Sequence, residues 1–363
     1  MGEILGLGAT HYPSLCAPPE RMLGFFHHIL SAPNIDPKYK ERANWPREML
    51  AEMGNDEGRA SIERYRERMW ANFRKQRQMI DDFAPDFIVL IGDDQYENFR
   101  EDIIPPFCVF GLDDDIDLQP WKNGGQPSAN GRANGWGEPG DWTMRIHGHR
   151  DGAKQLTTGL LRSGVAMPYA YKPLHLAGHG AGLGHAFTNT LLFLDCDRRG
   201  FPHPVVPFHV NCYGSMVMRS AGAVAHLFKT EPEPSLPDPP APTPALCMSV
   251  GAALARVIQA SPYRVVVMAS SSWSHCFLSP VGGWVIPDHV ADREMLAALR
   301  RADWDAWRNR SLEQIEQAGH HELLNWMVLA GAMAELDRKP VIDDWVETYI
   351  FQSDKCFASF AAN

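Results

Sequence analysis

Paired cysteines, long apolar runs and phosphate-binding loops are all missing from this sequence. Its seven cysteines include no CxxC pair and form no regular framework, which indicates reduced thiols. No apolar run approaches the roughly 20 residues that a membrane span needs. The glycine-rich residues 178–187 lack the GxxxxGKS or GxxxxGKT pattern of a phosphate loop, and no N-terminal signal segment is recognisable. We therefore expect a cytoplasmic protein that does not enter a membrane.

Basic charge is also scarce. The chain has 34 Lys and Arg against 44 Asp and Glu, a formal net charge of -10. This balance argues against nucleic acid or an anionic membrane surface as a partner. Hydrophobic residues make up 45% of the 363 residues, which is enough for a large core. The 11 Trp and 17 Phe favour an aromatic-rich interior or pocket.

The most informative stretch begins with a continuous apolar run at residues 87–91, the pattern of a strand buried on both faces. It runs into Gly92, Asp93, Asp94 and Gln95, which cannot continue such a strand. Open α/β sheets bind their ligands at the carboxyl ends of strands. From these residues alone, the stretch predicts either a ligand site or an acidic surface loop.

Buried strands alternate with amphipathic helices along the chain, which indicates a sheet with helices on its faces. We expect one α/β domain over residues 1–363, with a central mixed β-sheet flanked by helices and an active site at the strand C-terminal ends. The chain from about residue 292 onward is expected to be helical. The predicted strands are residues 3–8, 87–91, 168–174, 205–211 and 264–269, and the main predicted helices are residues 62–80 and 246–258.

The region at about 113–151 is rich in Gly, Asn and Trp and is too long for an ordinary connection. Because disordered segments avoid aromatic residues, its tryptophans favour a lid that packs on the protein. Two further insertions into the domain are expected at about 17–55 and 214–242.

Side chains that can bind a metal ion or transfer a proton recur at the predicted strand ends and at the start of one helix. Such ends gather at one edge of a sheet, so we expect these side chains to converge. Imidazole and carboxylate groups on a scaffold with open positions are typical of non-haem Fe(II) sites. Read singly, each has an ordinary explanation, such as a structural histidine or a carboxylate at a helix N-terminus. The candidates are His11, Asp94, Gln95 and His275 after strands, His185 in the glycine-rich segment and Glu322 at the start of a buried helix.

Five segments in chain order resemble the class III extradiol ring-cleavage dioxygenases, and together they extend over nearly the whole chain. Each segment is short, but five in the same order argue against coincidence. They are Thr-His-Tyr-Pro at 10–13, residues 92–99 followed by Ile-Ile-Pro-Pro-Phe at 103–107, Gly-His-Ala-Phe-Thr at 184–188, Ser-Ser-Ser-Trp-Ser-His at 270–275 and His-Glu-Leu-Leu-Asn-Trp at 321–326.

The resemblance implies an Fe(II) enzyme that cleaves the ring of a catechol-like or hydroxylated heteroaromatic substrate and incorporates both atoms of O2. It implies that His11 and Glu322 bind Fe(II) together with the residue at a second ligand position. His275 would act as base on a substrate hydroxyl and later as acid, and His185 would hydrogen-bond substrate or oxygen. Substrate-binding roles are expected for Tyr12, Tyr96 and Asn98.

The sequence departs from the family pattern at the second ligand position, where Gln95 replaces a histidine. Gln95 is favoured as the ligand because it occupies the register of that histidine, although an amide oxygen is a poorer donor to Fe(II) than imidazole. Alternatively, Asp94 or Asp93 turns in, which gives one histidine with two carboxylates and a preference for Mn²⁺ or Mg²⁺.

Two other functions stay open beside ring cleavage: another metal-dependent reaction on the same fold, or a non-catalytic binding protein that has lost iron. The expected partners are a small aromatic substrate and O2, without nucleic acid or membrane. We also expect a homo-oligomer.

Overall fold

The computed structural model describes residues 1–111, 115–122, 134–177, 182–214, 222, 224–229, 236 and 238–361. Parts of the expected insertions at 113–151 and 214–242, and part of the glycine-rich segment at 178–187, therefore lie outside the described residues. Among the described residues, no helix has both the length and the apolar character to cross a membrane.

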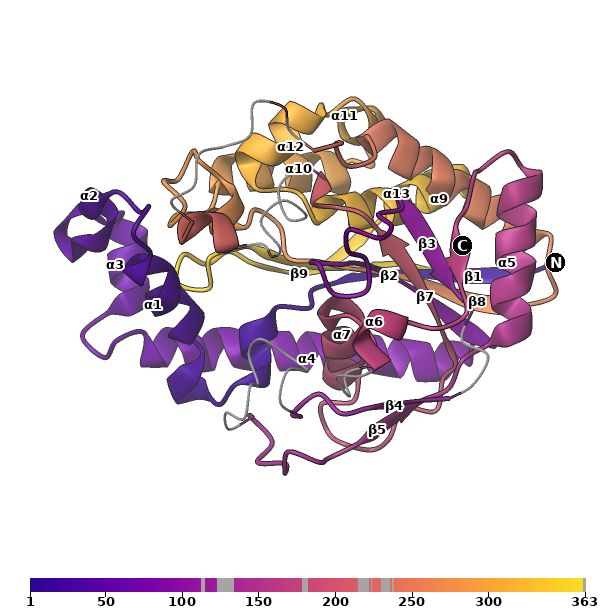
Figure 1. Cartoon of the computed structure of the whole chain (residues 1–363), viewed down its shortest axis with the longest axis horizontal. Coiled ribbons are helices and arrows are strands. Elements are labelled where there is room, and N and C mark those ends of the chain that lie inside the picture. The colour runs from indigo at the N-terminus through magenta and orange to yellow at the C-terminus, as the bar shows by residue number, and fades with distance from the viewer. Residues whose placement is uncertain are drawn as a thin grey trace.

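A mixed sheet forms the centre of the molecule, and its described strands lie in the order β6-β3-β7-β2-β8-β1-β10-β9 (Figure 1). A second sheet pairs β4 with β5. The strands of the large sheet are β1 Glu3–Ala9, β2 Phe87–Asp93, β3 Phe107–Phe110, β6 Tyr169–Ala170, β7 Val205–Val210, β8 Arg264–Ser270, β9 Val341–Val346 and β10 Lys355–Phe360, and those of the small one are β4 Ile116–Leu118 and β5 Met144–Ile146.

The four central strands β7, β2, β8 and β1 are parallel to one another. They are almost wholly buried, as expected for apolar runs covered on both faces. Strands β3 and β10 flank them in the antiparallel sense, so the sheet is mixed. The carboxyl ends of the four parallel strands consequently meet at one edge of the sheet.

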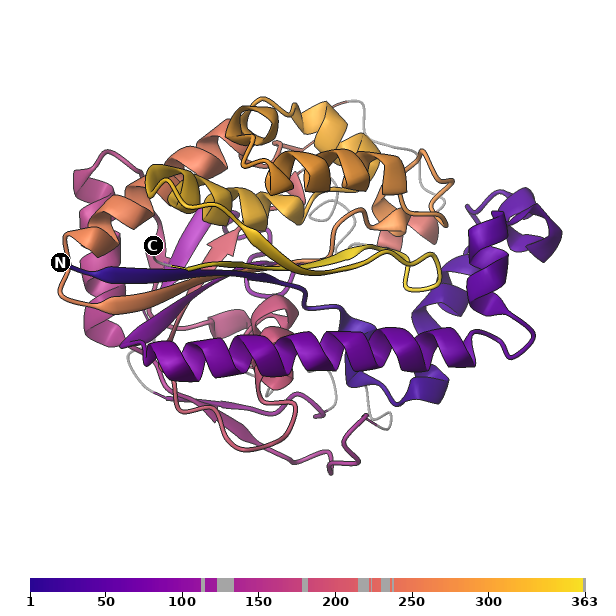
Figure 2. The ribbon, with the colours of Figure 1, turned by 180° about the vertical axis from the view of Figure 1, so that it is seen from behind.

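Helices cover both faces of the sheet. In Figures 1 and 2, α9 to α13 lie on one face and α4 with α7 on the other, while α1 to α3 project at the end remote from the N-terminus. The helices are α1 Gly24–Ser31, α2 Pro37–Lys40, α3 Arg47–Met53, α4 Arg59–Phe83, α5 Arg150–Arg162, α6 Leu174–Ala177, α7 His185–Leu194, α9 Pro244–Gln259, α10 His289–Arg300, α11 Trp304–Arg308, α12 Leu312–Ala318 and α13 Leu323–Glu335.

The expected α/β class, with a central mixed sheet flanked by helices, is confirmed. The expectation that the chain is helical from about residue 292 onward is wrong beyond α13, because the chain then forms β9 and β10. Strand β10 is fully buried beside β1 but contains the polar residues Lys355 and Ser359. A strand with buried polar residues lacks the continuous apolar run that identified the central strands.

The described tryptophans of the 113–151 region pack on the α4 and α7 side of the molecule. The ring of Trp136 lies 5.6 Å from that of Trp70 in α4, and its Nε1 donates to the carbonyl of Cys196 just after α7. The guanidinium of Arg198 lies 3.8 Å from the Trp136 ring. These contacts show a packed aromatic cluster at the C-terminal end of α7, and a role of the region as a lid stays a prediction.

Candidate metal and active site

The carboxyl ends of the central strands carry several of the residues that the sequence indicates. His11 follows β1 by two residues, Asp93 ends β2, and His275 lies five residues beyond β8. Because β1, β8 and β2 are adjacent and parallel, these positions meet at one edge. His185 begins α7 and Glu322 is the N-cap residue of α13, so two helices on opposite faces of the sheet lead to the same place (Figure 1).

Two glycines allow these helices to approach the strands closely. A Cβ atom on Gly8 of β1 would lie 2.3 Å from the ring of Trp326, one turn beyond Glu322 in α13. A Cβ atom on Gly92 of β2 would lie 3.1 Å from that of Ala186 in α7. Any side chain at Gly8 would therefore displace the helix that presents Glu322.

Four buried side chains form a donor cluster, defined as His11, Asp93, His185 and Glu322. Each offers a nitrogen or oxygen atom, and these atoms all lie within 4.8 Å of one another. Nε2 of His11 is 3.3 Å from Oε2 of Glu322 and 3.7 Å from Oδ1 of Asp93. Metal–ligand bonds of about 2.0–2.4 Å let one ion reach atoms up to about 4.8 Å apart. The cluster therefore has the dimensions of a single metal site.

Both histidines of the donor cluster are held through Nδ1. Nδ1 of His11 lies 3.1 Å from the carbonyl oxygen of Ser270, and Nδ1 of His185 lies 3.0 Å from Oε2 of Glu97. In the neutral form of such a ring, a proton on Nδ1 leaves Nε2 unprotonated and able to bind a metal ion. A carboxylate or carbonyl behind a histidine is the usual support of a metal ligand.

The carboxylates of the cluster have unused, buried oxygen atoms. Oδ2 of Asp93 and Oε2 of Glu322 have no hydrogen-bond partner among the described residues, and both side chains are at most 1% exposed. The amide of Asn325 holds the other oxygen of Asp93, at 3.1 Å from Oδ1. Buried carboxylate oxygens are costly unless hydrogen bonds or a cation satisfy them. The residues present therefore fit a divalent metal ion.

The charges of the cluster depend on burial and on each other. Burial, with the nearby Glu322, raises the pKa of Asp93 to about 6. Burial alone would raise the pKa of Glu322, but His275 and His11 outweigh it and hold that pKa well below its usual range. Burial likewise lowers the pKa of His185, but Glu97 outweighs it and the value rises to about 10. Glu322 is thus a fixed negative charge at the centre of the site.

Gln95 also lies in the site. Its Nε2 is 3.3 Å from both Nε2 of His185 and Oε1 of Glu322, and it donates to the hydroxyl of Tyr213. Tyr213 in turn donates to Oε1 of Glu322. Tyr213 is buried just after β7 and is absent from the sequence candidates. Its position beyond a correctly predicted strand is the signal that could have identified it.

Asp94 is turned toward the backbone of its own loop. Its Oδ1 accepts from the N–H groups of Glu97 and Phe99, and its Oδ2 accepts from that of Asn98. Asn98 is buried beside Gly184, and neither polar atom of its side chain has a partner among the described residues. An unpaired buried amide at the start of α7 is a group able to hold a polar ligand.

The two candidate tyrosines contribute no atom to the donor cluster. The ring of Tyr12 stacks on Phe351 at 5.1 Å, and Nζ of the buried Lys355 lies 4.1 Å from its centre. Tyr96 has a left-handed backbone with φ 64°, and its hydroxyl donates to the exposed Glu101. Tyr12 therefore forms part of an aromatic wall, whereas the hydroxyl of Tyr96 is engaged at the surface.

His275 lies beside the cluster, with Nε2 3.3 Å from Oε1 of Glu322. Its Nδ1 is buried and has no hydrogen-bond partner among the described residues. Burial lowers the pKa of His275, and the positive charges of His11 and Lys355 act in the same direction against Glu322. His275 is therefore a neutral imidazole at neutral pH, the form that accepts a proton.

A buried aspartate supports both halves of the site. Asp292 of α10 accepts hydrogen bonds from the N–H of Ser274 at 3.1 Å and from its hydroxyl at 2.6 Å. Oδ1 of Asp292 also lies 2.6 Å from Nε2 of His320. Ser274 precedes His275 directly, and His320 precedes Glu322 by two residues. No sequence pattern marked Asp292, because its role depends on two loops that meet only in the folded chain.

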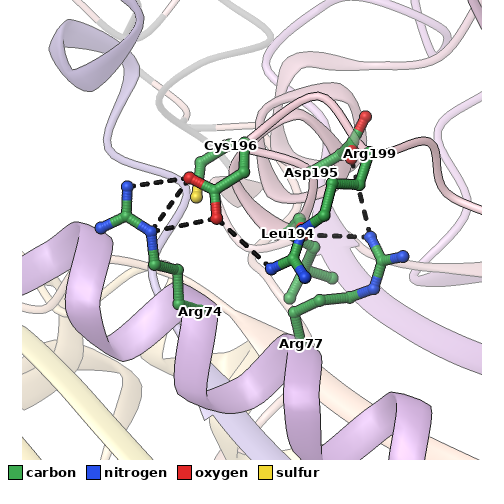
Figure 3. A pocket seen from close by; sticks show the side chains of 7 residues that line it. Arg74, Arg77, Leu194, Asp195, Cys196 and Arg199 are labelled. Atoms are coloured by element: carbon green, nitrogen blue, oxygen red, sulfur yellow. Dashed lines mark hydrogen bonds and ion pairs between the residues drawn. The ribbon is translucent and has the colours of Figure 1, made fainter.

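A small surface pocket lies elsewhere, between α4 and the turn after α7 (Figure 3). It is lined by arginines whose charges are already paired: Arg74 lies 2.8 Å from Asp197, and Arg77 lies 3.7 Å from Asp195. The pocket adjoins the C-terminal end of α7, whereas His185 begins that helix. It is therefore separate from the donor cluster.

Comparison with protein families gives a match in the C-terminal part of the chain. Residues 238–358 match the family described as the catalytic LigB subunit of aromatic ring-opening dioxygenase. The resemblance to the class III extradiol dioxygenases is confirmed. The matched residues include His275 and Glu322.

Two curated proteins are similar to the chain at low identity. The 2,3-dihydroxyphenylpropionate/2,3-dihydroxicinnamic acid 1,2-dioxygenase of Photorhabdus laumondii subsp. laumondii is 23% identical over 247 residues, which are 67% of this chain and 59% of that protein. The enzyme numbered 2 with the same description from Pseudomonas putida is 24% identical over 204 residues, 56% of this chain and 47% of that protein. The chain thus spans about half the length of these relatives.

Among solved structures, the uncharacterized protein JW3007 from Escherichia coli K12 superposes with a TM-score of 0.47 and 11% sequence identity. The superposition covers 81% of this chain and 92% of that one.

Proposed function

We propose that this protein is a metal-dependent ring-cleaving dioxygenase of the extradiol type, which opens a catechol-like or hydroxylated heteroaromatic ring with O2. Fe(II) is the proposed cofactor. The observation that carries the proposal is a buried donor cluster with two unused carboxylate oxygens, beside a neutral and partly unpaired histidine. The match of residues 238–358 to a ring-opening dioxygenase family supports it.

His11 and Glu322 would hold the metal ion, with Gln95 beside them in the register of the family's second histidine. A divalent ion bound there would bring two adjacent substrate oxygens and O2 together. The hydroxyl of Tyr213 donates to Oε1 of Glu322 and so orients the carboxylate. The other oxygen, Oε2, then faces His11 and can bind the ion.

His275 is the proposed acid–base group. Its Nε2 faces the carboxylate of Glu322 and so carries the proton of the neutral ring, which leaves the unpaired Nδ1 to take a proton from a substrate hydroxyl. The resulting imidazolium would lie next to the negative charge of Glu322, which stabilises it. His275 can return the proton when the ring opens.

His185 and Asn98 are the proposed contacts for substrate or oxygen. His185 points Nε2 toward the cluster while Glu97 holds its other side, and Asn98 offers an unpaired amide near the start of α7. Hydrogen-bond donors at these positions would stabilise negative charge that develops on oxygen. Tyr12 and Tyr96 are proposed to shape the approach to the site.

All seven cysteines are free, which supports the proposed cytoplasmic location. A homo-oligomeric state is proposed as well, and its test is the mass of the protein in solution.

The function is tested by O2 uptake with the Fe(II)-reconstituted protein against a panel of catechols and hydroxylated heteroaromatics. 2,3-Dihydroxyphenylpropionate is the first compound to try, because the curated relatives are described by it. At least one compound should give O2 uptake with loss of the aromatic absorption band, and His11→Ala should abolish both. Stoichiometric metal binding without O2 uptake on any compound would favour a different metal-dependent reaction.

A further inference from the structure

We propose that Asp93 is a metal ligand, so that this chain binds its ion through one histidine and two carboxylates: His11, Asp93 and Glu322. Gln95 then orients Glu322 by hydrogen bonding rather than binding the ion. The inference rests on the proposed function, because it assumes that the donor cluster holds a metal. It assigns a different residue to the place left by the missing histidine.

The position of Asp93 is the first argument. Asp93 ends β2, and its side chain is fully buried, with Oδ1 3.7 Å from Nε2 of His11. Asn325 fixes that oxygen at 3.1 Å, while Oδ2 has no partner among the described residues. Carboxylates that bind a metal ion commonly accept a hydrogen bond on one oxygen from a neighbouring residue, and Asp93 has this arrangement.

Asp94, the next carboxylate along the chain, already uses both of its oxygen atoms as hydrogen-bond acceptors. Three backbone N–H groups, from Glu97, Asn98 and Phe99, occupy both of its oxygen atoms. To reach the donor cluster, Asp94 would have to break these bonds and open the loop that follows β2. Such a buried rearrangement is costly because the three N–H groups would lose their acceptor.

Gln95 faces the site with its amide nitrogen rather than its oxygen. Oε1 of Glu322, 3.3 Å from the Gln95 Nε2, is a hydrogen-bond acceptor, so the group opposite it must be a donor. The hydroxyl of Tyr213 lies against the same nitrogen and gives its own proton to Glu322. The amide N–H₂ group cannot ligate a cation, and its place beside Oε1 leaves Glu322 with one free oxygen for the ion.

The charge of the site supports the same assignment. Asp93 and Glu322 are both at most 1% exposed, and a cation bound between two buried carboxylates this close would stabilise both. A ligand set with two carboxylates is harder, in the sense of hard and soft donors, than one with two imidazoles. The difference in binding affinity between Fe(II) and Mn²⁺ should therefore be smaller at this site.

The test is a metal titration of the apo-protein with Mn²⁺ and, without oxygen, with Fe(II), in competition with a chelator. Asp93→Asn should weaken both affinities by at least about 100-fold, and more for Mn²⁺ than for Fe(II). The matched control Asp94→Asn, one residue further on and also buried, should stay within about tenfold of the wild type. Metal affinity that survives in Asp93→Asn but is lost in Asp94→Asn or Gln95→Ala would overturn the assignment.

A second measurement needs no variant and so does not depend on how Asp93→Asn folds. Pulsed electron paramagnetic resonance of the Mn²⁺-loaded wild type counts the imidazole nitrogens bound directly to the ion. One such nitrogen, from His11, is expected; two would show that a second histidine, His185 or His275, binds the ion and would overturn the proposed ligand set.

Different results would contradict the proposed function and the assignment of Asp93. If the wild type binds neither ion, the proposed function fails together with this inference. If the wild type binds metal and consumes O2 with a catechol while Asp93→Asn binds metal equally well, only the assignment of Asp93 fails.

Discussion

The backbone N–H of His275 donates to the carbonyl of Gly319 at 2.9 Å, which joins the loop of the proposed acid–base histidine to the loop that leads to Glu322. Gly319 has φ 70°, and a Cβ atom there would lie 2.4 Å from the carbonyl oxygen of His275. The two loops can approach this closely because residue 319 has no side chain.

Gly319→Ala should therefore disturb His275 as well as strain its own backbone. We expect turnover to fall and the free energy of unfolding to drop by at least about 2 kcal/mol, measured by urea denaturation. Gly164→Ala is the matched control, since Gly164 has φ 88° with nothing within 4 Å of its Cβ position. It should cost about 1 kcal/mol and leave turnover intact. Equal losses of turnover and of unfolding free energy in the two variants would show that the contact between Gly319 and His275 does not matter for the site.

Replacing His275 should separate metal binding from turnover. His275→Ala is expected to retain the metal but lose turnover by on the order of 10²–10⁴-fold, the usual contribution of an acid–base group. His11→Ala should lose both, because it removes a ligand. The measurements are bound metal per chain and the rate of O2 uptake under saturating substrate. Metal loss in His275→Ala as large as in His11→Ala would mean that His275 is a ligand.

Stability should depend on pH through the buried Asp354. Burial, followed by the nearby Asp292, raises the pKa of Asp354 from 3.8 to about 8. The folded chain then keeps a proton that the unfolded chain loses, so this group's contribution to stability falls as pH rises from about 4 to 8 and is level above that.

Asp354→Asn should remove this dependence. Between pH 5 and 7 the free energy of unfolding of the wild type should fall more steeply than that of the variant, by up to about 1.4 kcal/mol per pH unit. Asp82→Asn, at an exposed position on α4, is the control and should keep the wild-type slope. Parallel curves for Asp354→Asn and the wild type would contradict the raised pKa.

The aromatic cluster after α7 should matter for stability and not for metal binding. Arg198 lies over Trp136 and Trp142 and bonds Glu138 through two nitrogens. Arg198→Lys loses the planar stacking and the paired hydrogen bonds, so we expect about 2 kcal/mol lower stability with unchanged metal affinity. Arg199→Lys, at an exposed position, serves as the control. A raised KM with unchanged stability in Arg198→Lys would instead support a lid.

Several of these relationships were accessible from the sequence and others were not. Apolar runs marked the central strands, so residues just beyond them, such as His11 and His275, could be chosen as site candidates. Glu322 could be chosen because it starts an apolar helix and matches a family motif. The strand β10 was missed because its buried face includes Lys355, which no hydrophobic pattern anticipates.

Side-chain direction is the part that the sequence could not supply. Asp93, Asp94 and Gln95 are consecutive, and the resemblance to a family favoured Gln95 as the ligand. Which of the three faces the cluster depends on the hydrogen bonds of the loop after β2 and on Tyr213 from the segment after β7. Such contacts between distant segments exist only in the folded chain.

The central claim is that this site inserts both atoms of O2 into an aromatic ring, and labelled oxygen tests it most directly. The metal-loaded protein is incubated with ¹⁸O₂ and the catechol that gives the fastest O2 uptake. The product is trapped promptly, and its mass is measured by mass spectrometry. The account predicts a ring-opened product that carries two ¹⁸O atoms, with one O2 consumed per ring and none in the His11→Ala control. A product that carries one ¹⁸O atom or none, or consumption of O2 with the ring left closed, would contradict it.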